Sequence, residues 1–135
     1  MSKSIAKRVK APPLPVPPDV ASAVRAADAK KAADVIVLDL RTAYVFTEFF
    51  VISTEQNQRQ IKAVADAIEE ALRVEHHRKP AHIEGYGRAE WVLLDYFDFV
   101  VHIFTPEMRT FYGLERLWGS AASVDLHGIL AGPKR

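Results

Sequence analysis

The sequence predicts an α/β fold in which a single mixed β-sheet is flanked by helices. Two runs of strand length, rich in β-branched and aromatic residues, lie at 34–40 and 49–53. A segment with strong helical periodicity follows at 57–75, and two further apolar runs precede a last helix. The order helix, strand, strand, helix, strand, strand, strand, helix implies one mixed sheet, and 135 residues suit one domain.

Residues 1–18 are predicted to form a basic, proline-rich, flexible tail. Five of the eight prolines fall between Pro12 and Pro18, which favours an extended polyproline conformation and a stiff linker. The PxxP spacing would also suit an SH3-like partner. The domain itself is predicted to span 19–118, and residues 119–135 are predicted to be a flexible tail with little to pack.

The first predicted helix runs from about Asp19, a plausible N-cap, to Ala33 through an alanine-rich stretch. The two strands that follow, at 34–40 and 49–53, are mostly apolar, and we expect both to be buried on two faces.

The second helix is predicted over 57–75 because its apolar residues recur with helical spacing. These residues are Ile61, Val64, Ala65, Ile68 and Leu72. Pro80 ends the helix, 81–84 is a short strand, and Gly85 and Gly87 mark a flexible turn.

The runs 91–96 and 99–104 are separated by only two residues, which predicts a β-hairpin. Thr105 is then a suitable N-cap, with Pro106 at the first helical position. We expect this last helix to continue to Trp118 and to stop at Gly119.

Composition excludes several classes of function. The chain has no cysteine, which removes disulfides, thiolate catalysis and cysteine zinc sites. Its first ten residues hold four basic and no acidic side chains, so the remainder carries 14 basic and 17 acidic side chains, a net charge of −3. That balance suits a basic protein partner better than nucleic acid. No apolar run is long enough to cross a bilayer, and we expect a cytoplasmic protein, or an organellar one if the source is eukaryotic.

The chain shows no complete catalytic or metal-binding motif. The candidate metal ligands lack a recognised spacing; they are His76, His77, His82, Glu84 and His102. We therefore expect no catalytic residue, metal or cofactor. Two alternatives are kept open: a metal-dependent nucleotidyl-transfer enzyme using Asp39, Asp95 and Asp98, and a small RNA-binding module that stacks bases on Tyr96, Phe97 and Phe99.

Aromatic residues concentrate between 86 and 118, a segment that holds both tryptophans. Phe111, Leu114 and Trp118 have the spacing of a helix face that packs on the sheet, so some of these side chains belong to the core. A domain of this size cannot readily bury them all, and exposed Tyr and Trp are typical of binding hot spots. The segment therefore predicts a surface for a macromolecular partner.

The same segment resembles a known family. Residues 85–104, Gly-Tyr-Gly-Arg-Ala-Glu-Trp-Val-Leu-Leu-Asp-Tyr-Phe-Asp-Phe-Val-Val-His-Ile-Phe, and 109–118, Arg-Thr-Phe-Tyr-Gly-Leu-Glu-Arg-Leu-Trp, are similar to the Iojap family, the ribosomal silencing factors. The apolar runs at 34–40 and 49–53 stand in the matching order. The chain departs from the family pattern at Glu48, where Asp is usual, and over 55–60, where Gly and Ser are usual.

The resemblance implies a nucleotidyltransferase-like fold without the active site. It implies a translational repressor that binds the large ribosomal subunit at ribosomal protein number fourteen and blocks joining of the small subunit when nutrients are scarce. Neither a membrane nor a sequence-specific nucleic acid is expected as a partner, and a homodimer is left open. The predicted contact residues are Trp91, Asp95, Tyr96, His102, Tyr112, Glu115 and Trp118. Trp91 and Tyr112 would be apolar anchors, and Asp95 and Glu115 would meet basic groups.

Overall fold

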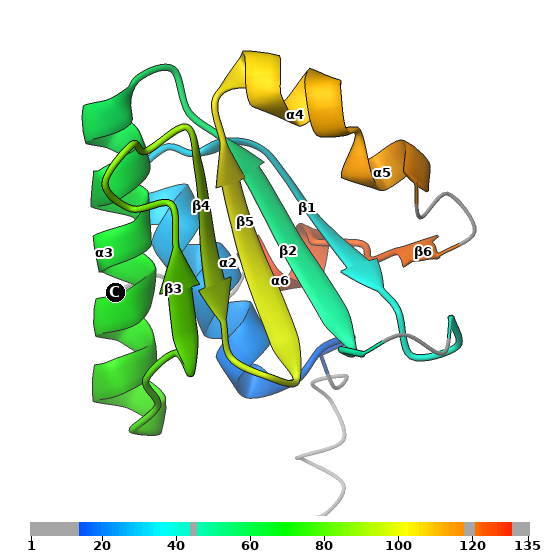
Figure 1. Cartoon of the computed structure of the whole chain (residues 1–135). Coiled ribbons are helices and arrows are strands. Elements are labelled where there is room, and N and C mark those ends of the chain that lie inside the picture. Colours follow the sequence, from blue (N-terminus) through cyan, green and yellow to red (C-terminus); the bar gives the residue numbers. More distant parts are fainter. Residues whose placement is uncertain (1–13, 44–45, 118–120, 131–135) are drawn as a thin grey trace, which may run out of the picture.

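The computed structural model of the chain describes residues 14–43, 46–117 and 121–130. They form one six-stranded sheet in the order β3-β4-β5-β2-β1-β6 (Figure 1). Strands β2 and β5 are parallel and the other neighbouring pairs are antiparallel. The strands are β1 (Ala33–Asp39), β2 (Phe49–Thr54), β3 (His82–Glu84), β4 (Trp91–Asp95), β5 (Phe99–Phe104) and β6 (Ala122–Ser123). The mixed-sheet prediction is confirmed.

Helices lie on both sides of this sheet. They are α2 (Pro18–Ala29), α3 (Gln58–His76), α4 (Pro106–Tyr112), α5 (Leu114–Leu117) and α6 (His127–Leu130). Helices α2, α3 and α6 cover one face, whereas α4 and α5 cross one end of the other (Figure 1). We call the two sides the helix-covered face and the open face. None of the helices in the described ranges is long and apolar enough to cross a membrane.

One of the two predicted helix caps, Thr105, is confirmed, and Asn57 provides a further cap that the sequence interpretation did not assign. Asn57 accepts the backbone N–H of Gln60 at 2.8 Å, and Thr105 accepts that of Met108 at 3.3 Å. The cap predicted at Asp19 is wrong, because α2 begins one residue earlier and Pro17 is its N-cap. The Asp19 carboxylate instead accepts a hydrogen bond from Arg78, in the loop after α3.

The helix-covered face contains the main core. Alternate residues of the strands, such as Val51, Val92 and Val101, pack there against the apolar faces of α2 and α3. All five predicted apolar positions of α3 are buried. Strand β2 is buried on both faces as predicted, but β1 is exposed at its start and only half-buried elsewhere, except at Val37 and Leu38.

The last predicted helix is interrupted. Gly113 adopts φ 53°, and its N–H donates to the carbonyl of Arg109, which ends α4 and starts the separate turn α5. Neither short helix contains a buried residue. The continuous helix predicted over 105–118 is therefore wrong at Gly113, because a left-handed residue cannot continue a right-handed helix.

The segment after residue 120 packs more than its composition suggested. Strand β6 pairs with β1, with Ser123 opposite Leu38. Ile129 in α6 is fully buried against the main core, and Arg25 donates to its carbonyl at 3.0 Å. Within the tail predicted at 1–18, Val16 is also buried. One buried apolar side chain thus attaches each terminal segment to the domain, while residues 1–13, 118–120 and 131–135 lie outside the described ranges.

Candidate partner-binding site

Strand alternation separates the predicted contact residues onto two faces. Trp91 and Leu93 pack with the open-face cluster, whereas Val92, Leu94 and Tyr96 belong to the helix-covered core. Tyr96 is 1 % exposed and its ring stacks on Phe99 at 4.9 Å. The assignment of Tyr96 as a contact residue is therefore corrected, because its side chain lies on the buried face.

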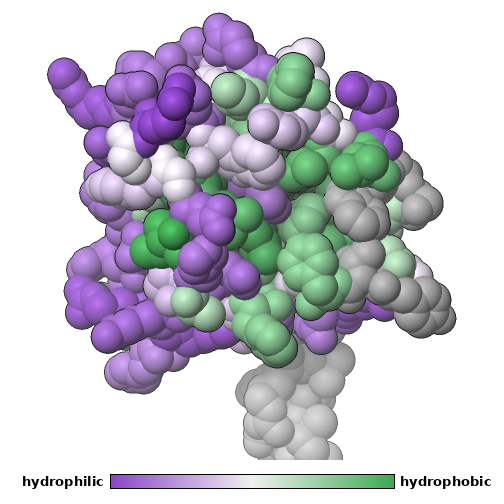
Figure 2. All heavy atoms as spheres, in the orientation of Figure 1, coloured by the Kyte–Doolittle hydropathy of each residue, from purple (hydrophilic) through white to green (hydrophobic). Residues whose placement is uncertain are grey.

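The open face carries a chain of aromatic rings. The ring of Trp91 lies 5.0 Å from that of Phe104 and 4.4 Å from that of Tyr112, which in turn lies 4.9 Å from Phe111. Tyr112 is 44 % exposed and Phe111 is 74 % exposed. We call Trp91, Phe111 and Tyr112 the aromatic ridge. Apolar side chains gather over the strands and beside α4 and α5, next to a mostly hydrophilic surface over α3 (Figure 2).

His102 holds Trp91, one residue of the aromatic ridge, in place through a hydrogen bond. It pairs with Leu93 across the hairpin, is 4 % exposed, and its Nδ1 accepts the indole N–H of Trp91 at 3.1 Å. This hydrogen bond places the ring proton on Nε2 and holds the indole in one orientation. Burial lowers the pKa of His102 to about 3, so the ring is neutral at physiological pH. His102 is thus a positioning residue for Trp91, and the prediction that it contacts a partner directly is corrected by its burial.

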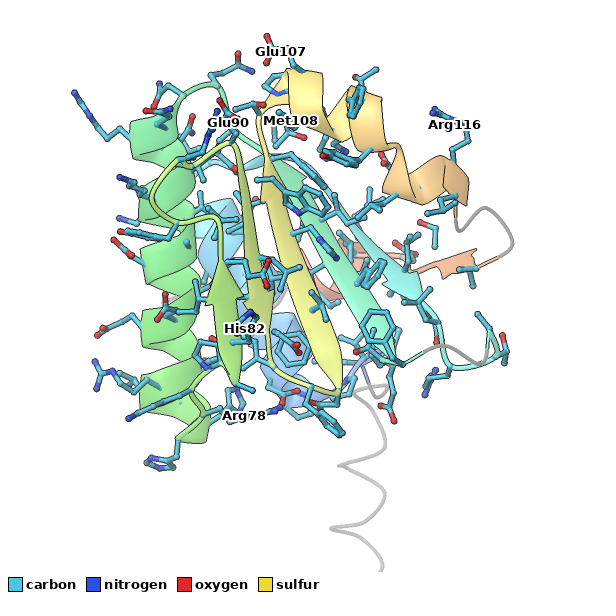
Figure 3. All side chains as sticks on the ribbon, in the orientation of Figure 1. Arg78, His82, Glu90, Glu107, Met108 and Arg116 are labelled. Carbon is cyan, nitrogen blue, oxygen red and sulfur yellow. The ribbon has the colours of Figure 1, made fainter. Side chains whose placement is uncertain are left out.

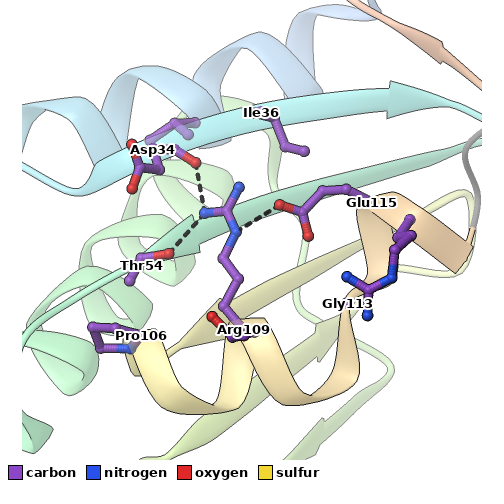
Figure 4. Close-up of a pocket in the computed structure, with 10 residues that line it drawn as sticks. Asp34, Ile36, Thr54, Pro106, Arg109, Gly113 and Glu115 are labelled. Atoms are coloured by element: carbon purple, nitrogen blue, oxygen red, sulfur yellow. Dashed lines mark hydrogen bonds and ion pairs between the residues drawn. The ribbon is translucent and has the colours of Figure 1, made fainter.

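Arg109 joins α4 to the sheet. Its guanidinium donates to the carbonyl of Asp34 and to the hydroxyl of Thr54, both at 2.7 Å, and to the carboxylate of Glu115 at 2.9 Å (Figure 4). These bonds tie α4 to β1, β2 and α5 beside a hollow of about 740 Å³. The side chain of Glu115 is half-buried, and it already forms an ion pair with Arg109 in the free protein.

Glu55 is buried where β2 ends. It is 1 % exposed, and in the described part of the chain neither carboxylate oxygen has a hydrogen-bond partner. Burial raises the pKa of Glu55 to about 7, although the positive charge of Arg109 acts in the opposite direction. Glu55 therefore changes charge near neutral pH inside the protein, next to the residue that anchors α4.

Among the described residues, the predicted contact residue Asp95 lies apart from the ridge. Asp95 accepts the backbone N–H of Phe97 at 2.8 Å and so shapes the turn of the hairpin. Trp118 lies outside the described residues. Tyr112 and Trp91 are thus the predicted residues that the structure brings together at the surface.

The carboxylates of the alternative enzyme do not converge. Asp39 pairs with Arg41, Asp98 pairs with Arg78, and Asp95 is used in the hairpin turn. Across the described ranges, no group of three or more His, Asp or Glu side chains is placed to hold a metal ion. The RNA-stacking alternative loses two of its three platforms, because Tyr96 and Phe99 are buried.

The sequence interpretation missed two exposed side chains, Phe111 and Leu117, which are 74 % and 69 % exposed. Phe111 was predicted to face the core together with Leu114, and only Leu114 packs on the open-face cluster. The spacing argument failed because Gly113 separates the two residues into different helices. A glycine inside a predicted helical stripe was the signal that could have shown this.

Comparisons with known proteins agree on one family. Residues 13–135 match the family described as "Ribosomal silencing factor during starvation". A ribosomal silencing factor from Halalkalibacterium halodurans is 37 % identical over 109 residues, which cover 81 % of this chain and 92 % of that protein. The chloroplastic protein Iojap of Zea mays is 36 % identical over 105 residues, which cover 78 % of this chain and 45 % of that protein. A crystal structure from Chromobacterium violaceum superposes with a TM-score of 0.71 at 32 % identity, and covers 75 % of this chain and 83 % of the other.

Proposed function

The chain belongs to the ribosomal silencing factor family, and from this premise we propose that it represses translation by binding the large ribosomal subunit at ribosomal protein number fourteen. In this position the bound domain sterically prevents the small subunit from joining. The protein acts by occupying a surface, without a catalytic step.

The observation that carries this proposal is the aromatic ridge. Phe111 and Tyr112 project from a short helix with no buried residue, and Trp91 is held beside them by its bond to His102. Rigid, exposed aromatic side chains are the usual energetic centre of a protein interface. Core packing does not explain Phe111, since the residue is 74 % exposed.

Charge supports a basic protein as the partner. Beyond its first ten residues the chain carries a net charge of −3, and a basic ribosomal protein would complement it. Glu115, whose carboxylate is half-buried beside Arg109, supplies an acceptor near the ridge. Since ribosomes are the proposed partner, we place the protein in the cytoplasm; the maize relative is named as chloroplastic.

Co-sedimentation with purified large ribosomal subunits tests the proposal. The wild-type chain should pellet with the large subunit, and Phe111→Ser should weaken this binding at least about tenfold, as expected for a hot-spot residue. Val74→Ser is the matched control, because Val74 is an apolar side chain of α3 that is 56 % exposed. If the wild-type chain stays at the top of the gradient, the proposal fails.

A second measurement addresses the finer claims. Light scattering of mixed ribosomal subunits should show that the wild-type chain slows the joining of the two subunits. The Phe111→Ser variant should leave the rate of joining close to that without added protein. A photo-crosslinking group placed at position 112 should form a covalent crosslink to ribosomal protein number fourteen. Crosslinking only between copies of this chain would assign the ridge to a homodimer and overturn the proposed contact.

A further inference from the structure

A second exposed aromatic surface lies at the opposite end of the sheet. Phe46 is 73 % exposed and Phe97 is 79 % exposed, and they border a hollow of about 380 Å³. Phe46 precedes β2 and Phe97 precedes β5, whereas α4 follows the end of β5; since β2 and β5 are parallel, the two surfaces are separated by the length of the sheet. Figure 3 shows Arg78 at this end and Met108 and Glu107 at the other. The hairpin-end surface comprises Leu40, Arg41, Phe46, Thr47, Glu48, Phe97 and Asp98.

The backbone holds Phe97 in place at this surface. Its N–H donates to Asp95, its carbonyl accepts the hydroxyl of Thr47 at 3.0 Å, and Glu48 donates from its backbone to the carbonyl of Asp98 at 2.9 Å. Phe97 has φ 78°, a left-handed conformation that costs a non-glycine residue about 1 kcal/mol or more. Its exposed ring recovers little of that cost by burial. An exposed aromatic side chain on a strained backbone that hydrogen bonds hold in place points to a binding role.

The surroundings of the hairpin-end surface are acidic. The charged side chains that line it, or that bond to its lining residues, are Asp39, Glu48, Asp95, Asp98, Arg41 and Arg78, which give a net charge of −2. Both arginines are already paired, Arg41 with Asp39 at 2.7 Å and Arg78 with Asp98 at 2.8 Å. Acidic groups around aromatic rings suit lysine and arginine side chains, which gain both ion pairing and cation–π contact.

The chain itself carries a basic segment directly before the described residues. Val16 is buried in the core, and Asp19 is linked through Arg78 to Asp98, so the N-terminal segment enters the domain beside Phe97. Residues 1–13 carry four basic side chains and no acidic one, and thirteen residues can extend to about 45 Å. A tether this short gives an effective concentration of about millimolar, which permits weak contacts to form.

We propose that residues 1–13 of this chain bind the hairpin-end surface, with their basic side chains over the rings of Phe46 and Phe97 and beside Glu48 and Asp98. This contact goes beyond the proposed ribosomal function and uses none of the residues of the aromatic ridge. Its failure and that of ribosome binding are therefore separable.

Paramagnetic relaxation enhancement in the full chain tests the contact. The chain has no cysteine, so Ser4→Cys creates a single site for a nitroxide label. The amide signals of Thr47, Glu48 and Asp98 should lose most of their intensity, and should recover it in about 1 M salt, where the Debye length is about 3 Å. Phe97→Gly should abolish the loss, and because glycine accepts φ 78° this variant should fold at least as well as wild type.

The controls separate the other occupants of the surface. Val74→Ser should leave the signal loss unchanged. Mixing isotope-labelled chain without nitroxide and unlabelled chain with nitroxide should give no loss; loss in that mixture would show that the segment binds a second copy, and would overturn the proposal. Loss spread evenly over the domain, or centred on α4 and α5, would overturn it as well.

Discussion

On the helix-covered face, 22 of the described residues form one buried cluster beneath α2, α3 and α6, whereas the cluster on the open face contains six. The two clusters share strands: Val51 and Val101 point to the first, and Phe50, Ile52 and Val100 to the second. The helices differ in the same sense, since α3 buries five side chains and α4 and α5 bury none. One face supplies hydrophobic stability, and the other keeps apolar surface available.

This difference explains how α4 is held. A helix without buried side chains gains little from the hydrophobic effect, and seven residues are too few for a stable isolated helix. Its attachment depends on the Thr105 cap, on partial packing of Met108 and on the hydrogen bonds of Arg109. The binding surface is thus placed by polar contacts on a scaffold whose stability comes from elsewhere.

The largest expected effect is in the helix-covered core. Phe99→Ala removes a fully buried ring that stacks on Tyr96, and should lower the free energy of unfolding by about 3–5 kcal/mol. Urea unfolding followed by circular dichroism measures it. A loss below about 1 kcal/mol would mean that the two faces contribute similarly to the free energy of unfolding. The proposed difference between the helix-covered face and the open face would then be wrong.

Arg109→Met should have the next largest effect, about 2–3 kcal/mol, because it leaves the hydroxyl of Thr54 and the carbonyl of Asp34 without their donor. Hydrogen exchange should show the amides of α4 opening before those of α3. Arg116→Met, at an exposed position on α5, is the matched control and should stay within about 0.5 kcal/mol of wild type. Equal protection of α4 in both variants would exclude Arg109 as its anchor.

Glu55→Gln should stabilise the protein in a pH-dependent way. Because the pKa of Glu55 is raised from 4.5 to about 7, folding favours its protonated form, and the wild-type chain loses stability as pH rises through this window. The advantage of the variant over wild type should therefore grow by about 1–3 kcal/mol between pH 5 and pH 8. Glu107→Gln, at an exposed position, should show no such change. A pH-independent difference for Glu55→Gln would contradict the raised pKa.

The sheet and the long helices could be predicted because each rests on a local pattern. The periodicity of Ile61, Val64 and Ile68 gave α3, and the two-residue gap between apolar runs gave the β4–β5 hairpin. The errors arose where the outcome depends on contacts far away in sequence. Composition alone does not show that β6 pairs with β1 or that Ile129 reaches the core.

The candidate site could be predicted only in part, because some of its residues depend on contacts far away in sequence. Trp91 and Tyr112 were both predicted as contact residues, and their rings meet on the open face. Their contact with a partner stays a prediction. Tyr96 was misplaced although alternation from Val92 and Leu94 puts it on the covered face. Arg109 and Glu55 could not be found, since their importance comes from burial and from partners that the fold brings together.

The smallest expected effect on stability is that of Phe111→Ala. Its ring is 74 % exposed and contacts Tyr112 edge to face, so truncation should change the free energy of unfolding by about 0.5 kcal/mol or less. The same truncation should weaken binding to the large ribosomal subunit at least about tenfold, if the ridge is the centre of the interface. Phe99 and Phe111 thus form a matched pair of identical substitutions on opposite faces, measured by urea unfolding and by co-sedimentation. If the Phe111→Ala chain unfolds at a clearly lower urea concentration and binds the large subunit normally, the open face also contributes to the stability of the fold.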